Sequence, residues 1–304
     1  MSALQRIAVL GAGLMGHGIA QVFAAAGHEV GVYDPSEPSI QSLRLRIRDN
    51  LKTLECPSGA EARVHGTTSL AAAVAGADVV IEAALEDLAV KQRLFAEVEA
   101  LVPVQTILAS NTSVIPITAI MAKLTHRARS IGAHWWNPPF LIPLVEVIGT
   151  VDTSAATIET MMALLKAAGK TPVHVKKDVP GFIGNRMQHA LWREAIALVA
   201  QGICTAEDVD TVVKASFGRR LGVLGPLENV DLVGTDLTLA IHRNVLPAID
   251  STPDASPALA SMVEAGRFGM KSNQGFYNWT EPQKANLRAR VFAELKRAAA
   301  ADDH

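Results

Sequence analysis

A glycine-rich turn between an apolar strand and a helix is the feature that most constrains the fold of this chain. The run Ile7–Leu10 reads as a short buried strand, and Gly11, Gly13 and Gly16 follow it in the spacing G-x-G-x-x-G. Between a strand and a helix, this spacing is typical of a dinucleotide-binding turn, whereas a lone match is weak evidence. Gly11 allows the tight turn, Gly13 lets a pyrophosphate approach the backbone, and Gly16 lets the helix pack close to the strand. The free N–H groups at the start of the helix then face the phosphates.

The second predicted strand ends in an acidic residue that distinguishes between dinucleotides. Glu29–Tyr33 is followed directly by Asp34. A carboxylate here accepts hydrogen bonds from the adenosine ribose hydroxyls and repels a 2′-phosphate, so we expect NAD rather than NADP. A nearby arginine would permit NADP, and an incidental Asp after a structural glycine turn is the alternative without a cofactor. The cofactor contacts predicted at this turn are Gly11, Gly13, Leu14, Met15, Gly16 and Asp34.

Composition indicates a globular protein and argues against several classes of partner. The 304 residues are 49% hydrophobic and 19% charged, which suits a chain with a substantial core. A formal net charge of −2 provides no bulk attraction to nucleic acid or to a membrane surface. The most apolar stretch, 71–85, is interrupted by Asp78 and is too short to span a bilayer. Cys56 and Cys204 form no CxxC pair, which favours a cytoplasmic location and offers no thiolate metal site.

Hydrophobic periodicity divides the chain into two unlike parts. The first part alternates apolar runs with helical patterns, which predicts a mainly parallel, doubly wound sheet with helices on both faces. Beyond Pro180-Gly181 the patterns are almost entirely helical. We therefore expect an α/β, Rossmann-like domain over 1–180 and an all-α domain over 181–304. The predicted strands lie at 7–10, 29–33, 64, 79–81, 107–108, 130–133, 144–148 and 173–175, and the predicted helices include 40–51, 91–101, 155–168, 186–200, one from Thr205, and 283–299.

The segment that is most informative about chemistry runs from His134 to Glu146. His134 ends a predicted strand, at the edge where loops gather over the cofactor in an open α/β sheet. Glu146 lies in the next apolar run, so a tight reversal would bring the two side chains together. A carboxylate on one imidazole nitrogen fixes the tautomer and leaves the other nitrogen to take a substrate hydroxyl proton. Taken singly, His134 is better explained as a core or surface histidine and Glu146 as an outward residue of an edge strand, so the interpretation depends on the flanking motifs.

Six motifs occur in order along nearly the whole chain: the turn at Gly11, 86–91, 110–113, the segment at His134, 180–186 and 271–277. In these motifs the sequence resembles the L-3-hydroxyacyl-CoA dehydrogenase family. The resemblance implies that His134 is the catalytic base in oxidation, oriented by Glu146. It also implies that the neutral donors Ser113 and Asn185 contact the reacting oxygen. The further NAD contacts that it implies are Glu86, Lys91, Ser113, Asn137 and Lys271.

Several of these positions also have plainer interpretations. The run 110–113 is typical of a helix cap, and Asn137 before Pro138 is typical of a turn. Lys91 and Lys271 are also explained as solvated surface residues.

Two departures from the family pattern concern the substrate. Members that act on CoA thioesters carry a long, lysine-rich helical hairpin after the second strand. Here residues 35–77 form a short segment with the single lysine Lys52 and three arginines at alternate positions, which cannot share one helix face. Arg219 and Arg220 replace what is usually an uncharged glycine-rich loop. An arginine there would pair with a free substrate carboxylate, although an exposed basic pair explains it equally well.

The sequence therefore predicts a two-domain, NAD-dependent dehydrogenase that oxidises a secondary hydroxyl β to an acyl carbon. Family breadth slightly favours a 3-hydroxyacyl-CoA, and with it fatty acid metabolism. The alternative is a small free hydroxy acid or alcohol of the carnitine, gulonate or pyridine-alcohol type. A non-catalytic NAD-binding protein is a further alternative, because fold alone does not imply activity. Apolar runs at 221–224 and 230–239 predict a homodimer through the helical part.

Overall fold

The computed structural model describes residues 5–56 and 59–302, which belong to two compact units. The first unit contains the chain up to Arg186 together with the segment from Phe292 onward. The second unit extends from Met187 to Val291. The chain thus passes into the second unit soon after Pro180-Gly181, and the end of the last helix groups with the first unit.

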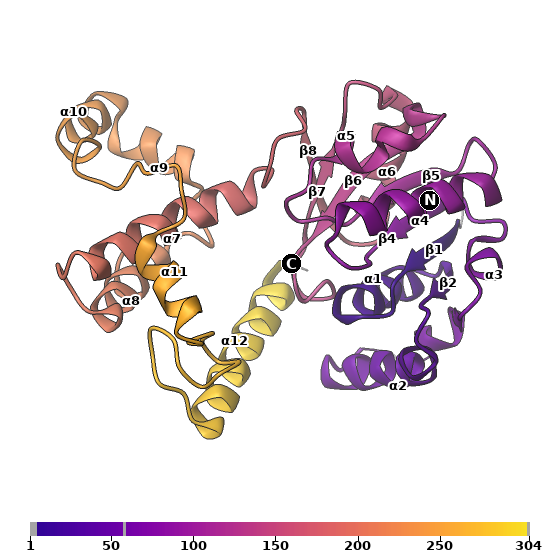
Figure 1. Ribbon diagram of the computed structural model, residues 1–304, viewed down its shortest axis with the longest axis horizontal. Coiled ribbons are helices and arrows are strands. Elements are labelled where there is room, and N and C mark those ends of the chain that lie inside the picture. The colour runs from indigo at the N-terminus through magenta and orange to yellow at the C-terminus, as the bar shows by residue number, and fades with distance from the viewer. Residues whose placement is uncertain (1–4, 57–58, 303–304) are drawn as a thin grey trace. The chain divides into compact units, whose positions relative to one another are not determined.

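The first unit is built on one eight-stranded sheet with the order β3-β2-β1-β4-β5-β6-β7-β8 (Figure 1). All neighbouring strands are parallel except β6 and β7. The chain leaves β1 first toward one edge and then, from β4, toward the other, which confirms the predicted Rossmann-like, doubly wound fold. The strands are β1 (Arg6–Leu10), β2 (Glu29–Tyr33), β3 (Val64–Thr67), β4 (Val79–Glu82), β5 (Ile107–Ser110), β6 (Ser130–Trp135), β7 (Leu144–Ile148) and β8 (Thr171–Val175).

Helices cover both faces of the sheet, so alternate residues of a strand enter different apolar cores. Ile7 and Val9 of β1 pack in one core with residues of α1, α2 and α6, whereas Ala8 and Leu10 pack in the other with residues of α3, α4 and α5. The helices of this unit are α1 (Leu14–Ala25), α2 (Glu37–Thr53), α3 (Leu70–Val74), α4 (Leu88–Leu101), α5 (Ile117–Ile120) and α6 (Ala155–Ala167), with the short 3-10 turns η1 (Ala60–Arg63), η2 (Met121–Lys123) and η3 (Arg127–Arg129).

The chain beyond β8 is helical in the part that the structure describes, apart from isolated bridges at Gly269, Gln274 and Asn278. The helix predicted from Thr205 is present and Thr205 caps it, because its side chain accepts from the Asp208 amide and the Asp208 carboxylate accepts from the Thr205 amide. None of the described helices is both long enough and apolar enough to cross a membrane. The helices are α7 (Gly184–Ala200), α8 (Ala206–Ala215), α9 (Pro226–Val233), α10 (Thr235–Val245), α11 (Pro257–Glu264) and α12 (Glu281–Asp302), with the 3-10 turn η4 (Phe217–Arg219).

The glycine turn after β1 has two tight positions and one open position. Gly11 has a φ of 110°, and a Cβ on Gly16 would lie 1.8 Å from the Gly11 carbonyl oxygen. A Cβ on Gly13, in contrast, would meet no atom within 4 Å. Gly11 and Gly16 are therefore required by the turn itself, whereas the free space at Gly13 is available to a bound group.

We predict that alanine at Gly16 lowers stability, whereas alanine at Gly13 weakens NAD binding. Gly16→Ala should lower the free energy of unfolding by about 1–3 kcal/mol because the backbone has to shift. In a domain of this size, that corresponds to a fall in Tm of roughly 2–10 °C. Gly13→Ala should leave the Tm of the free protein unchanged but weaken NAD binding, which titration calorimetry measures. A Gly13→Ala protein that binds NAD like wild type would contradict this interpretation of the open space.

Candidate active site

Six strands of the sheet, β1 to β6, end at one edge, and five of them place candidate functional groups there. β1, β2, β4, β5 and β6 are mutually parallel, so their carboxyl ends meet. At these ends lie the glycine turn, Asp34, Glu82, Ser110 and His134. The carboxyl edge of an open parallel sheet is where such folds bind ligands.

The antiparallel pairing of β6 and β7 brings His134 directly opposite Glu146. The side chain of His134 is 5% exposed and that of Glu146 is 1% exposed. The imidazole Nδ1 lies 2.9 Å from Glu146 Oε2. Because a carboxylate only accepts hydrogen bonds, Nδ1 carries the proton of this bond. The imidazole Nε2 is therefore the nitrogen available for proton transfer.

The other oxygen of Glu146 is bound by the start of α7. Oε1 accepts hydrogen bonds from the backbone amides of Ile183 at 2.8 Å and of Gly184 at 3.0 Å. Burial tends to raise the pKa of the Glu146 carboxyl, but the bond to His134 and these two amides outweigh it and lower the pKa below its ordinary value. Glu146 is consequently an anion that stabilises a positive charge on His134.

Aromatic side chains enclose the imidazole of His134. The rings of Trp136 and Phe182 each lie 5.5 Å from it, centroid to centroid. Trp136 packs so closely on the start of α7 that a Cβ on Gly184 would lie 2.4 Å from its Cζ2 atom. The contacts with Trp136 and Phe182 restrict rotation of the His134 imidazole.

Ser113 and Asn185 lie next to each other in the first unit, as their predicted roles require. Asn185 Nδ2 donates a hydrogen bond of 2.9 Å to the backbone oxygen of Ser113. The Ser113 side chain is exposed and Asn185 is half-buried, so both are accessible to a small molecule. Their contact with a reacting oxygen stays a prediction.

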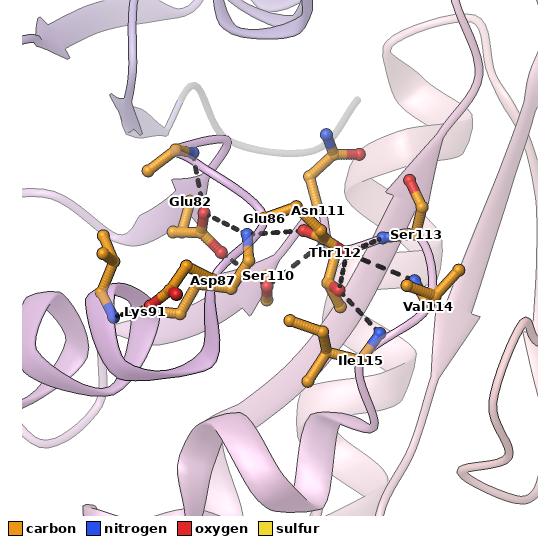
Figure 2. A network of polar contacts seen from close by, with 12 residues as sticks. Glu82, Glu86, Asp87, Lys91, Ser110, Asn111, Thr112, Ser113, Val114 and Ile115 are labelled. Atoms are coloured by element: carbon orange, nitrogen blue, oxygen red, sulfur yellow. Dashed lines mark hydrogen bonds and ion pairs between the residues drawn. The ribbon is translucent and has the colours of Figure 1, made fainter. Parts of the chain in front are cut away.

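Glu86 and Lys91 belong to a polar network that Figure 2 shows in full. The Lys91 ammonium contacts Glu82 at 2.7 Å and Glu86 at 3.1 Å, and its side chain is 1% exposed. This burial excludes a solvated Lys91 ammonium. The contact of Lys91 with NAD stays a prediction. Sequence reasoning missed Glu82, although a carboxylate that ends the buried run Val79–Ile81 beside the polar end of β5 was a signal for it.

The glycine turn and Asp34 fit the diphosphate and ribose of NAD. Asp34 Oδ2 accepts from the Ala12 amide at 2.8 Å, which orients the carboxylate beside the turn. The first bond of α1 runs from the His17 amide to the Gly13 carbonyl. The amides at Leu14 to Gly16 thus have no partner inside the helix, which is what allows a helix N-terminus to bind a phosphate.

The remaining predicted contacts are exposed. Asn137 lies in the loop that follows β6. Arg219 and Arg220, at the end of η4, and Lys271, in the loop before α12, belong to the second unit. Their roles in binding NAD or substrate stay predictions.

Comparison with known proteins relates both parts of the chain to one family. The family model for the 3-hydroxyacyl-CoA dehydrogenase NAD binding domain matches residues 6–179, and the model for the C-terminal domain of the same family matches residues 181–279. The 5-formyl-3-hydroxy-2-methylpyridine 4-carboxylate 5-dehydrogenase of Mesorhizobium japonicum is 35% identical, over 94% of each chain. The human mitochondrial hydroxyacyl-coenzyme A dehydrogenase is 36% identical, over 91% of each chain.

Two solved structures show how far the likeness extends in space. A crystal structure of a 5-formyl-3-hydroxy-2-methylpyridine 4-carboxylic acid 5-dehydrogenase matches with a TM-score of 0.90 at 34% identity, covering 99% of this chain and 98% of that one. The (S)-3-hydroxybutyryl-CoA dehydrogenase of Ralstonia eutropha matches with a TM-score of 0.76 at 33% identity, covering 92% of this chain and 100% of that one. The chain therefore belongs to the 3-hydroxyacyl-CoA dehydrogenase family of NAD-dependent oxidoreductases.

Proposed function

We propose that this NAD-dependent enzyme oxidises the alcohol of a small free carboxylic acid, with His134 as the general base. The observation that carries the chemistry is the buried pair of His134 and Glu146, whose Nδ1–Oε2 distance is 2.9 Å. A histidine that is oriented on one nitrogen and available on the other is the arrangement that general base catalysis requires. The intact pair also argues against a non-catalytic NAD-binding protein.

In the proposed reaction His134 Nε2 takes the proton of the substrate hydroxyl. The Glu146 carboxylate keeps the proton on Nδ1 and stabilises the imidazolium that forms. Ser113 and Asn185 supply neutral donors to the oxygen as it becomes a carbonyl. NAD, when bound at the glycine turn, supplies the acceptor for the hydride that leaves the carbinol carbon.

The segment after β2 supports a small acid rather than a CoA thioester, because its arginines already have partners within the protein. Arg44 donates to the Val64 carbonyl at 2.7 Å, and Arg46 donates to the Ala12 carbonyl at 2.8 Å. Arg48 pairs with Glu61 at 3.1 Å. These three cations point to different groups, so they form no cluster for the phosphates of CoA.

Overall similarity supports the same choice. The TM-score of 0.90 to the pyridine carboxylate dehydrogenase exceeds the score of 0.76 to the hydroxybutyryl-CoA enzyme, at nearly equal sequence identity. The first of these acts on a compound that is a free carboxylic acid by name. A 3-hydroxyacyl-CoA is the second candidate, favoured by the family models and by the human relative. A role in fatty acid metabolism would follow only from the second candidate, and a cytoplasmic location stays a prediction.

A substrate screen distinguishes the two candidates. We expect NADH formation, followed at 340 nm, with at least one free acid among carnitine, gulonate, 3-hydroxybutyrate and 5-formyl-3-hydroxy-2-methylpyridine 4-carboxylate, the last of which would react as the hydrate of its formyl group. 3-Hydroxybutyryl-CoA at the same concentration should react at least about tenfold more slowly. A thioester lacks the free carboxylate with which an arginine would pair, and the loss of one such ionic contact is worth about that much. Preferential turnover of the CoA thioester would overturn the proposed substrate class.

Replacement of the base tests the chemistry itself. His134→Gln should lower turnover by roughly 10²- to 10⁴-fold, the usual contribution of a general base, while NADH binding measured by fluorescence stays unchanged. Glu146→Gln should lower turnover by a smaller factor, because a neutral amide stabilises the imidazolium formed during proton transfer less well than a carboxylate does. Wild-type turnover in either variant would remove that residue from the proposed pair.

We further propose that the protein is a homodimer that associates through its helical part. Helices α7 to α11 contain no buried residue, although they are rich in large apolar side chains. Val223 is 92% exposed, Leu227 77% and Leu232 72%. Helices with so much apolar surface in water are stabilised by a partner, and stable interfaces bury about 1,200–2,000 Å².

Sedimentation velocity at micromolar concentration should give twice the mass of one chain. The double variant Leu227→Glu and Leu232→Glu should shift the protein toward monomers, because it places two charges in the proposed interface. Val151→Glu is the matched control, since Val151 is 96% exposed in the first unit. A wild-type monomer, or dissociation caused by Val151→Glu alone, would contradict a dimer through the helical part.

A further inference from the structure

We propose that Glu82 is a positioning residue for the active site, acting through Lys91 and Glu86 on the backbone of Ser113. This inference deepens the proposed function, because it concerns how the residues around the reacting oxygen are placed. In it the buried ammonium of Lys91 connects two carboxylates, and a contact of Lys91 with NAD stays a separate prediction. Glu82 ends β4, Glu86 lies in the loop that follows, and Lys91 lies in the first turn of α4 (Figure 2).

Glu82 is fully buried and each of its oxygens is engaged. Oε1 accepts from the Lys91 ammonium and from the Ala84 amide, both at 2.7 Å. Oε2 accepts from the Ser110 hydroxyl at 2.6 Å. A buried carboxylate with three donors, one of them a cation, has one strongly preferred orientation at the carboxyl ends of two neighbouring strands.

Lys91 connects the buried carboxylate of Glu82 to Glu86. Its ammonium bonds Glu82 on one side and lies 3.1 Å from Glu86 Oε2 on the other. Glu86 is 39% exposed, so without Lys91 its Oε2 would lose this cation and face water, while the donors at 112–114 still held Oε1. Two carboxylates thus share one ammonium.

Glu86 in turn binds the segment that contains Ser113. Its Oε1 accepts from the Thr112 hydroxyl at 2.5 Å, the Ser113 amide at 2.9 Å and the Val114 amide at 3.3 Å. Although partial burial tends to raise the pKa of Glu86, the bonds from Thr112 and Lys91 outweigh it and lower the pKa, so that Glu86 remains an acceptor at neutral pH. The backbone oxygen of Ser113 then accepts from Asn185. A continuous series of contacts thus connects the interior with both predicted donors to the substrate.

Glu82→Gln tests this series, since it removes the charge and keeps the shape. We expect kcat/KM to fall by about 10- to 100-fold, the size of effect that small misplacements of reacting groups produce. Glu86→Gln should have a similar effect. Because Glu82 acts through Glu86, the double variant should lie within about twofold of Glu86→Gln alone. Full additivity of the two effects, or wild-type kcat/KM in Glu82→Gln, would overturn the proposal.

The matched control is Glu99→Gln on α4, the helix that contains Lys91. Glu99 pairs with Arg129 at 3.3 Å, with side chains 14% and 6% exposed, and accepts from the amides of Thr125 and His126. Losing this largely buried pair should lower the Tm as Glu82→Gln does but leave kcat/KM within about twofold of wild type. A large loss of kcat/KM in Glu99→Gln would mean that any weakened ion pair of α4 has this effect, and that the role of Glu82 is merely structural.

Hydrogen exchange measured by mass spectrometry provides a readout that needs no substrate. Amide exchange in a peptide over 110–116 should be at least about tenfold faster in Glu82→Gln and unchanged in Glu99→Gln, because local opening controls exchange. Unchanged exchange in Glu82→Gln would overturn the proposal even if activity fell. If the wild-type protein turned over none of the screened substrates, the proposed function would be contradicted. The exchange measurement would still test the role of Glu82, because it needs no substrate.

A second variant covers the case in which Glu82→Gln does not fold. Glu82→Met combined with Lys91→Met removes both buried charges and replaces them with apolar side chains of similar length, which proteins often tolerate. Glu86 is then without its cation, and exchange over 110–116 should rise as in Glu82→Gln. A folded double methionine variant with wild-type exchange would contradict the proposal.

Discussion

The parallel sheet determines where every candidate functional group lies. Because β1, β2, β4, β5 and β6 run in the same direction, their carboxyl ends meet at one edge, and the residues that follow them are neighbours in space although they are far apart in sequence. The one reversal, between β6 and β7, matters equally. It places Glu146 within a strand, opposite His134, and so brings a carboxylate to this edge from a strand that runs the other way.

Buried charge is the second constraint on this site, because an unpaired charge in the interior is costly. Two carboxylates are buried near the edge, and each is compensated by a specific set of donors. Glu146 is bound by His134 and two amides at the start of α7, and Glu82 by Lys91, an amide and a hydroxyl. The first set leaves an imidazole nitrogen available for chemistry. The second satisfies all of its members, which is the pattern expected of a group that positions others.

The residues that determine the substrate class differ from those that determine the chemistry. The acid–base pair and the glycine turn fit any oxidation of a secondary alcohol by NAD. The choice between a free acid and a CoA thioester depends instead on α2 and its arginines, which are engaged with the protein itself. Arg46 is notable among them because its partner is the Ala12 carbonyl within the glycine turn. A residue that would otherwise be counted as a ligand for phosphate thus stabilises the cofactor turn.

Much of the fold was predictable because its signals are local. The strand, glycine turn and helix at the N-terminus, the acidic end of β2 and the cap at Thr205 all depend on residues a few positions apart. The alternation of strands and helices then predicted a doubly wound sheet, which the structure confirms. The reversal between His134 and Glu146 was also visible in the sequence, since two apolar runs flank a proline-rich loop.

What only the tertiary structure decided is where long polar side chains point and what they meet. Lys91 has four flexible bonds and stands in the first turn of an amphipathic helix, so periodicity allowed either a solvated or a buried ammonium. Its interior position depends on Glu82, which reaches the same place from another strand. The amides that bind Glu146 come from the start of α7, far along the chain. The sequence by itself determined the elements and the residue types at the sheet edge, because these follow from local patterns. The pairing of buried charges required the full packing, because it depends on strand register and on contacts between distant segments.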